Sequence, residues 1–171
     1  MKRLAIATAL GFLTACSGDS SPTAPSAPPA NIAGSYDTTV TAASTCSANL
    51  PTETRALQFL SEVTQTGGTV QVKLIAKVPG VPELTFSGTV SGQTVNFPSF
   101  SFTQTMGRGA ALSASGNATV GSGANAPITG TLNGTYQTAS GASCNAANHQ
   151  LQMVKLCVTP TTTGTAMLPC Q

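Results

Sequence analysis

The chain of 171 residues predicts an all-β fold, and the favoured architecture is an eight-stranded antiparallel up-and-down barrel. Charged residues make up only 7% of the chain, while Thr, Ser, Gly, Ala and Val are abundant, which favours strands. From Ile32 onward apolar and polar residues alternate with period two between turn signals. An even number of consecutive antiparallel strands lets the last pair with the first, which removes exposed edges. A two-sheet β-sandwich is the alternative.

Turn signals divide this part of the chain into eight predicted strands. The clearest hairpin joins residues 54–65 to 69–78 across a glycine turn, and a second hairpin turns at Ser91 and Gly92. The eight strands are expected at residues 34–43, 54–65, 69–78, 84–90, 93–106, 110–120, 128–138 and 148–158.

The fifth strand contains a change of phase. Val95 and Phe97 alternate at odd positions, whereas Phe100 and Phe102 alternate at even positions. Pro98 lies between the two sets, and proline inside a strand is typical of a bulge or bend. We therefore predict a bulge at this proline.

The seventh strand has two interpretations. Asn133 and Gly134 have the composition of a tight hairpin turn. A turn there would place Tyr136 on the face opposite to Leu132, whereas a continuous strand keeps the two side chains on one face. We therefore predict one continuous strand.

A targeting signal precedes the predicted domain. It consists of Lys2 and Arg3, ten mostly apolar residues at 4–13, and a small-residue region that ends in Cys16. Ten residues form a helix of roughly 15 Å, half the thickness of a bilayer's hydrocarbon core, which indicates an export signal instead of a membrane span. The run LTAC resembles the lipobox of bacterial lipoproteins, and the resemblance covers the whole leader. An ordinary secretory signal cut after Ala9 is the alternative, and it would leave an apolar core of about six residues.

The lipoprotein resemblance implies a membrane anchor. In that family Cys16 carries a diacylglycerol, the leader is removed, and the new amine receives a further acyl chain such as palmitate, so we expect a lipid-anchored protein of the bacterial cell envelope. Ser17 in place of Asp resembles the version that is delivered to the outer membrane. The expected organisation is a signal peptide at 1–15, a lipidated cysteine and Pro/Ser/Ala-rich disordered linker at 16–31, the barrel at 32–158 and a disulfide-closed tail at 159–171.

Four cysteines remain once Cys16 is assigned to the anchor. An even number in an exported protein predicts two disulfides, with three possible connectivities. In an up-and-down barrel, Cys46 after the first strand and Cys144 before the last lie at the same end, while Cys157 lies roughly 30 Å away at about 3.3 Å per residue. We therefore predict the pairs Cys46–Cys144 and Cys157–Cys170.

Charge and composition exclude several partners. Without Lys2 and Arg3, the seven basic residues fall to five, against five acidic residues, and no basic cluster for nucleic acid remains. A single histidine and the lack of a C-x-x-C pair argue against a metal site, and we expect no cofactor.

The sequence predicts no enzymatic activity. It contains no G-x-S-x-G motif, and its carboxylates are scattered. We interpret His149 as a partly exposed residue at a strand start that is hydrogen-bonded to a neighbour; the alternative is a catalytic triad with Asp37, if the first and last strands pair. Arg55 lies near the Cys46 rim and is interpreted as a solvated strand-end charge, with binding of an anionic group as the alternative.

The remaining hypotheses concern binding. The plan resembles lipocalin-like and other calycin barrels in architecture, although the G-x-W motif is missing, and that resemblance implies an interior that holds one small apolar molecule. The ligand-facing residues would be Leu74, Phe86, Val95, Phe97, Phe102, Leu132, Tyr136 and Met153. A mouth-connected apolar cavity of about 300 Å³ or more would favour this hypothesis, and a lumen that the inward side chains close completely would exclude it.

Two other functions stay open. Small barrel lipoproteins that inhibit lysozyme are similar in their anchored, disulfide-bearing plan, so binding of an envelope protein is the first alternative. A structural surface module without a dedicated ligand is the second.

Overall fold

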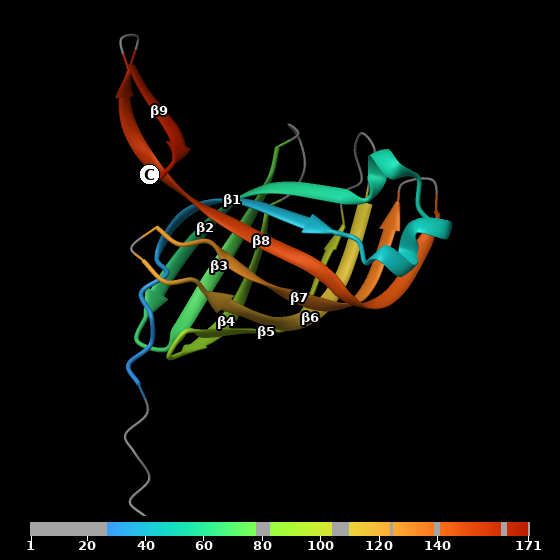
Figure 1. The fold of residues 1–171 in the computed structure, drawn as a ribbon, viewed down its shortest axis with the longest axis horizontal. Coiled ribbons are helices and arrows are strands. Elements are labelled where there is room, and N and C mark those ends of the chain that lie inside the picture. Colours follow the sequence, from blue (N-terminus) through green and yellow to red (C-terminus); the bar gives the residue numbers. More distant parts are fainter. Residues whose placement is uncertain are drawn as a thin grey trace, which may run out of the picture.

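The protein folds as a closed β-barrel with a projecting hairpin (Figure 1). The computed structural model describes residues 27–77, 83–103, 110–123, 125–138, 141–161 and 164–170. Within these ranges nine strands form one antiparallel sheet in sequence order, and β1 pairs with both β2 and β8. The β1–β8 pairing closes strands β1 to β8 into a barrel, which confirms the predicted fold class.

The strands lie close to their predicted positions because the period-two pattern sets them. Their bounds are β1 (Gly34–Thr41), β2 (Ala56–Thr66), β3 (Thr69–Ala76), β4 (Leu84–Ser91), β5 (Thr94–Thr103), β6 (Ala110–Val120), β7 (Ile128–Thr138), β8 (Ser143–Thr161) and β9 (Gly164–Pro169). Two short 3-10 helices, η1 (Ser44–Ala48) and η2 (Thr52–Thr54), lie between β1 and β2. Along β2 the side chains of Leu57, Phe59, Ser61 and Val63 are buried, and those between them are more exposed.

Two details of the strands agree with the predictions and one differs. The β5–β6 register shifts between Phe97 and Phe100, as the phase change at Pro98 predicts. Strand β7 is continuous. The β4–β5 turn lies one residue later than predicted, because Ser91 pairs with Thr94 and Gly92 adopts a positive φ of 55°.

The last barrel strand begins earlier than predicted, at Ser143 instead of Asn148. Asn148 has a φ of 71°, and the β7–β8 register shifts beside it, so the strand passes through a bulge. The residues before this bulge lack an alternating apolar pattern, so the sequence signal starts only at His149.

Strand β9 was not predicted. Strand β8 continues past its pairing with β1, and residues Leu156–Thr161 pair with β9 to form a hairpin that projects from the barrel (Figure 1). A disulfide joins Cys157 to Cys170, as predicted. The expected tail loop is therefore a cross-linked hairpin.

A segment between β1 and β2, residues 42–55, closes one end of the barrel and is called the end cap. The disulfide Cys46–Cys144 joins it to β8, which confirms the second predicted pair. The hydroxyl of Tyr136 on β7 donates a hydrogen bond to the carbonyl of Thr54 in the end cap. Leu50 in the end cap is buried. Covalent and hydrogen bonds thus hold this end shut.

The opposite end is closed by the chain that enters β1. Ile32 is buried there, its amide donates to the side chain of Gln65, and its carbonyl accepts the hydroxyl of Tyr36. The amide of Ala30 donates to the carbonyl of Gly92 in the β4–β5 turn. The predicted tether therefore meets the barrel at the end opposite to the end cap.

The leader and Cys16 lie outside the described residues, as does most of the predicted linker. In the described part of the chain, no helix has the length and apolar character needed to cross a bilayer.

Candidate functional site

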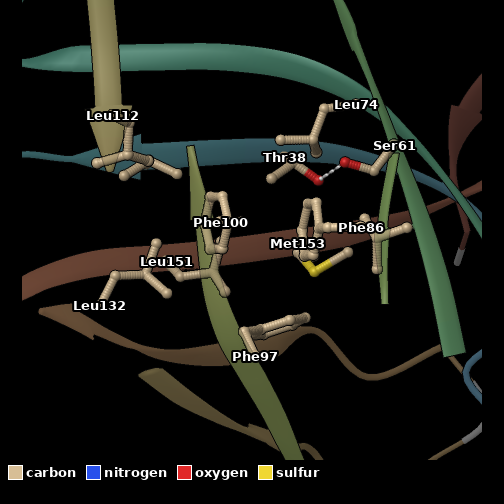
Figure 2. Close-up of a pocket in the computed structure, with 12 residues that line it drawn as sticks. Thr38, Ser61, Leu74, Phe86, Phe97, Phe100, Leu112, Leu132, Leu151 and Met153 are labelled. Atoms are coloured by element: carbon tan, nitrogen blue, oxygen red, sulfur yellow. Dashed lines mark hydrogen bonds between the residues drawn. The ribbon is translucent and has the colours of Figure 1, made fainter. Parts of the chain in front are cut away.

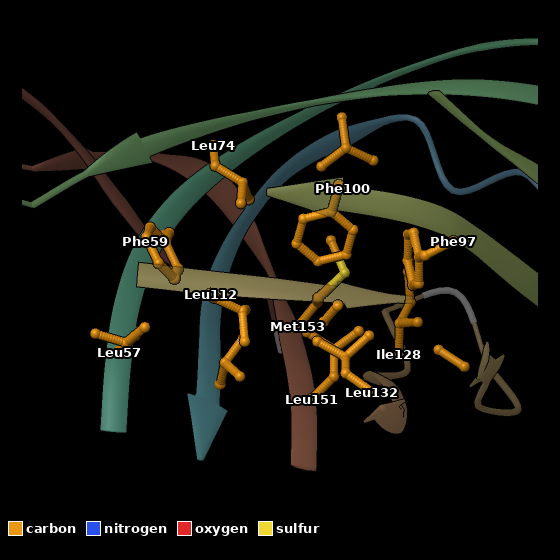
Figure 3. Close-up of a cluster of buried hydrophobic side chains, with 14 of the residues drawn as sticks. Leu57, Phe59, Leu74, Phe97, Phe100, Leu112, Ile128, Leu132, Leu151 and Met153 are labelled. Carbon is orange, nitrogen blue, oxygen red and sulfur yellow. The ribbon is translucent and has the colours of Figure 1, made fainter. Parts of the chain in front are cut away.

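The barrel interior is an apolar core to which all eight barrel strands contribute (Figure 3). Of the predicted ligand-facing residues, those with buried side chains are Leu74, Val95, Phe97, Leu132, Tyr136 and Met153. Phe86 is half-buried, and the side chain of Phe102 lies outside the described part of the structure. The alternation of strand residues therefore identified the inward face correctly wherever the side chain is described.

A small cavity lies within this core (Figure 2). Its volume is about 20 Å³, and its lining comes from every barrel strand. This is close to the space that one water molecule needs, and far below the roughly 300 Å³ of a typical ligand pocket. The lumen is therefore closed to any larger molecule unless side chains move.

Two hydroxyl groups lie among the apolar side chains of the cavity. Thr38 on β1 and Ser61 on β2 are buried, and their oxygens lie 2.6 Å apart in a hydrogen bond (Figure 2). Neither residue is among the predicted ligand-facing residues, because apolar character was the only signal for an inward position. Position would have identified Thr38, since it lies between the inward residues Tyr36 and Val40.

The barrel wall is weakest between β4 and β5. These strands share three residue pairs, whereas every other neighbouring pair in the barrel shares between six and eleven. The ladder stops at Thr89 and Asn96, next to the bulge at Pro98. Residues 84–88 of β4 and 97–103 of β5 have no residue pairs with each other, and we call this stretch of the wall the seam.

Aromatic rings fill the seam, where the β4–β5 ladder of residue pairs has ended. The rings of Phe86 and Phe100 stack with centroids 4.4 Å apart and planes 7° apart. Phe86 also meets Phe97 edge to face, with centroids 6.0 Å apart. All three side chains line the cavity (Figure 2). Side-chain packing thus holds the wall together here. Phe86 lines the cavity and is itself only half-buried.

His149 is buried, so its interpretation as partly exposed was wrong. Its ring links two segments of the chain through hydrogen bonds, and we call this link the brace. Its exposed fraction is 0%. Its Nδ1 accepts the amide of Ala43, 3.0 Å away, and its Nε2 lies 3.0 Å from the carbonyl of Gly134, to which it donates. A ring that accepts at Nδ1 and donates at Nε2 is the neutral tautomer. Both nitrogens are occupied in joining the end cap to the β7–β8 bulge.

The structure does not bring Asp37 and His149 together. Asp37 lies on the outer face of β1, where its carboxylate forms an ion pair with Lys77 at 2.8 Å. The proposed triad of these two residues with a serine therefore has no geometric basis.

Arg55 also has a local structural role. Its Nε donates to the carbonyl of Leu50 and its Nη2 to the carbonyl of Ser47. These bonds fold the end cap back on itself, and they use two of the five N–H donors of the guanidinium.

Burial and charge change the pKa of three side chains. Burial raises the pKa of Tyr136 and, to a smaller extent, that of Tyr36, because the phenolate form would lose its hydration. A hydrogen bond to Glu83 raises the pKa of Lys73 on the outer face.

Within the described residues, no three His, Cys, Asp or Glu side chains gather as a metal site would require. Comparison with known proteins gives no match to a family model, a curated protein or a solved structure. The candidate site therefore depends on its own geometry: an apolar lumen with one buried hydroxyl pair and one weak stretch of wall.

Proposed function

We propose that this domain binds a small apolar molecule in its lumen, and that the molecule enters through the seam between β4 and β5. The observation that carries the proposal is the short β4–β5 ladder of three residue pairs. Beyond this ladder the rings of Phe86, Phe97 and Phe100 close the wall between the two strands. A filled lumen counts against a permanently open carrier, so binding requires the seam to open.

The energetics favour opening at this place. Each backbone hydrogen bond contributes about 0.5–1.5 kcal/mol net, so separating any fully paired wall breaks several such bonds at once. A stacked aromatic pair contributes about 0.5–1.5 kcal/mol beyond its buried area. Rotation of the half-buried Phe86 out of the seam breaks two ring contacts and no ladder bond, because residues 84–88 have no partners on β5.

The chemistry of the lumen suits an uncharged, mainly hydrocarbon molecule. Ten of the twelve residues that line the cavity are Val, Leu, Phe or Met. An apolar ligand that replaces the Phe86 ring gains about 25 cal/mol for each Å² of apolar surface removed from water. Rotation of Phe86 both opens the seam and enlarges the cavity.

A titration with the fluorescent apolar probe N-phenyl-1-naphthylamine tests the proposal. We expect saturable binding to one site, and association about fivefold faster in Phe86→Ala, since the ring contacts that close the seam are worth about 1 kcal/mol. Ser87→Ala is the matched control, because Ser87 is the next residue of β4 and is exposed. A lack of probe binding by both the wild type and Phe86→Ala would contradict the proposal and leave binding of an envelope protein or a structural module as the remaining roles.

We also propose that Cys16 carries a lipid that anchors the domain in the bacterial cell envelope, at the outer membrane. The lipobox-like run LTAC and the proline-rich segment after it support this proposal. Two or three acyl chains hold a protein on a bilayer far more firmly than one. Labelling cells with a fatty-acid probe should mark the wild type and not Cys16→Ala, and an intact mass that starts at another residue would contradict the anchor.

A further inference from the structure

We infer that the ligand of the lumen is a neutral molecule with a hydrogen-bond-accepting oxygen, and that Thr38 and Ser61 bind this oxygen. The inference rests on the proposed function and specifies its ligand class. It starts from the only two polar side chains among the twelve described residues around the cavity.

The hydroxyl pair is fully enclosed. Thr38 is 2% exposed and Ser61 is 0% exposed. They lie diagonally across the β1–β2 ladder, where Thr38 pairs with Phe59 and Ser61 pairs with Tyr36. Both side chains point into the lumen beside Leu74 and Met153 (Figure 2). The pair is therefore positioned by the continuous eight-pair β1–β2 ladder.

A count of protons shows that the pair can bind one more acceptor. Each hydroxyl has one proton to donate, and the 2.6 Å bond between the two oxygens uses one of the two protons. The second proton has no acceptor among the residues that the structure describes. A buried donor without an acceptor is destabilising, so a ligand oxygen at this place, which accepts the second proton, is stabilised.

The charge of the lining restricts the ligand further. No charged side chain occurs among the described residues of the cavity wall. Burial of a carboxylate or an ammonium without a partner costs far more than one hydrogen bond returns. Ketones, esters and alcohols therefore fit the site, whereas ionised fatty acids and amines do not, and a plain hydrocarbon leaves the proton unused.

Displacement of N-phenyl-1-naphthylamine by three ligands of similar length tests this specificity. 2-Undecanone supplies a neutral oxygen, undecane supplies none, and decanoate supplies a charged one. We expect 2-undecanone to bind about tenfold more tightly than undecane, which corresponds to one hydrogen bond of about 1.4 kcal/mol, and decanoate to bind most weakly.

The proton count also predicts how variants behave. In Thr38→Val or Ser61→Ala the remaining hydroxyl still has one free proton, so each single variant should keep the preference for 2-undecanone. The double variant has no hydroxyl and should bind 2-undecanone and undecane equally. Probe binding by the double variant shows that its lumen is still folded, and Thr89→Val, an exposed hydroxyl on β4, is the control.

The two proposals fail in different ways. If the probe binds but the ketone preference is missing in the wild type, or persists in the double variant, the hydroxyl pair does not bind the ligand and the apolar site remains. If the probe and all three ligands fail to bind, both proposals are wrong.

Discussion

Removal of the Cys46–Cys144 disulfide should destabilise the barrel strongly. The bond joins residues 98 positions apart in the sequence, and a loop of that length restricts the unfolded chain by about 4.7 kcal/mol in the loop-entropy model. It also holds the end cap on β8, beside the contacts of His149 and Tyr136. The double variant Cys46→Ala with Cys144→Ala should therefore lose about 4–5 kcal/mol.

Urea unfolding followed by far-UV circular dichroism measures this loss. With a slope of about 1–3 kcal/mol per molar urea, the midpoint should fall by roughly 2–4 M. The control variant lacks Cys157 and Cys170, which lie 13 positions apart in the sequence. Their disulfide cross-links the projecting hairpin, in which β9 pairs with β8. The same model gives about 3 kcal/mol for this shorter loop, but β9 pairs with the projecting end of β8, so we expect the loss to fall on the hairpin and the barrel midpoint to shift less. Equal shifts in the two variants would refute the view that the end cap, and not the hairpin, stabilises the barrel.

Three further predictions concern the buried groups and the seam. Because burial raises the pKa of Tyr36 and Tyr136, the stability that these two tyrosines contribute should be constant below about pH 10, the value in the unfolded chain, and fall as the pH rises further; tyrosinate absorbance that titrates without loss of stability would contradict this. His149→Ala leaves one amide and one carbonyl without their partner, and it should lower the unfolding free energy by about 2–5 kcal/mol in urea titrations, whereas a loss below about 1 kcal/mol would exclude the brace. In hydrogen exchange measured by NMR, the amides of Thr85 and Ser87, which face β5 across the seam, should exchange faster than the paired β4 amides; equal protection would show that a ladder closes the seam.

The sequence was sufficient to predict the eight barrel strands, because a half-buried strand must alternate and this chain alternates over most of its length. It also predicted the bulge at Pro98, since a proline cannot donate to the ladder and the apolar positions change parity there. The sequence also predicted the pairing of Cys46 with Cys144, because in an up-and-down barrel the end of the first strand and the start of the eighth lie at the same end.

Other features depend on information that alternation does not contain. Thr38 and Ser61 point inward although their type suits either face of a strand, so only register shows that they meet. The seam arises from how far the β4–β5 ladder extends, which depends on the geometry of the bulge. The burial of His149 depends on the end cap, a segment without regular pattern that two 3-10 turns and a disulfide fold over the barrel.

The position of a bound ligand tests the central claim most directly. A crystal structure with 2-undecanone should show the hydrocarbon chain in the lumen, its oxygen within hydrogen-bond distance of Thr38 or Ser61, and the ring of Phe86 rotated away from Phe100. A ligand on the outer surface, with the Phe86–Phe100 stack intact and the lumen still closed, would contradict the account.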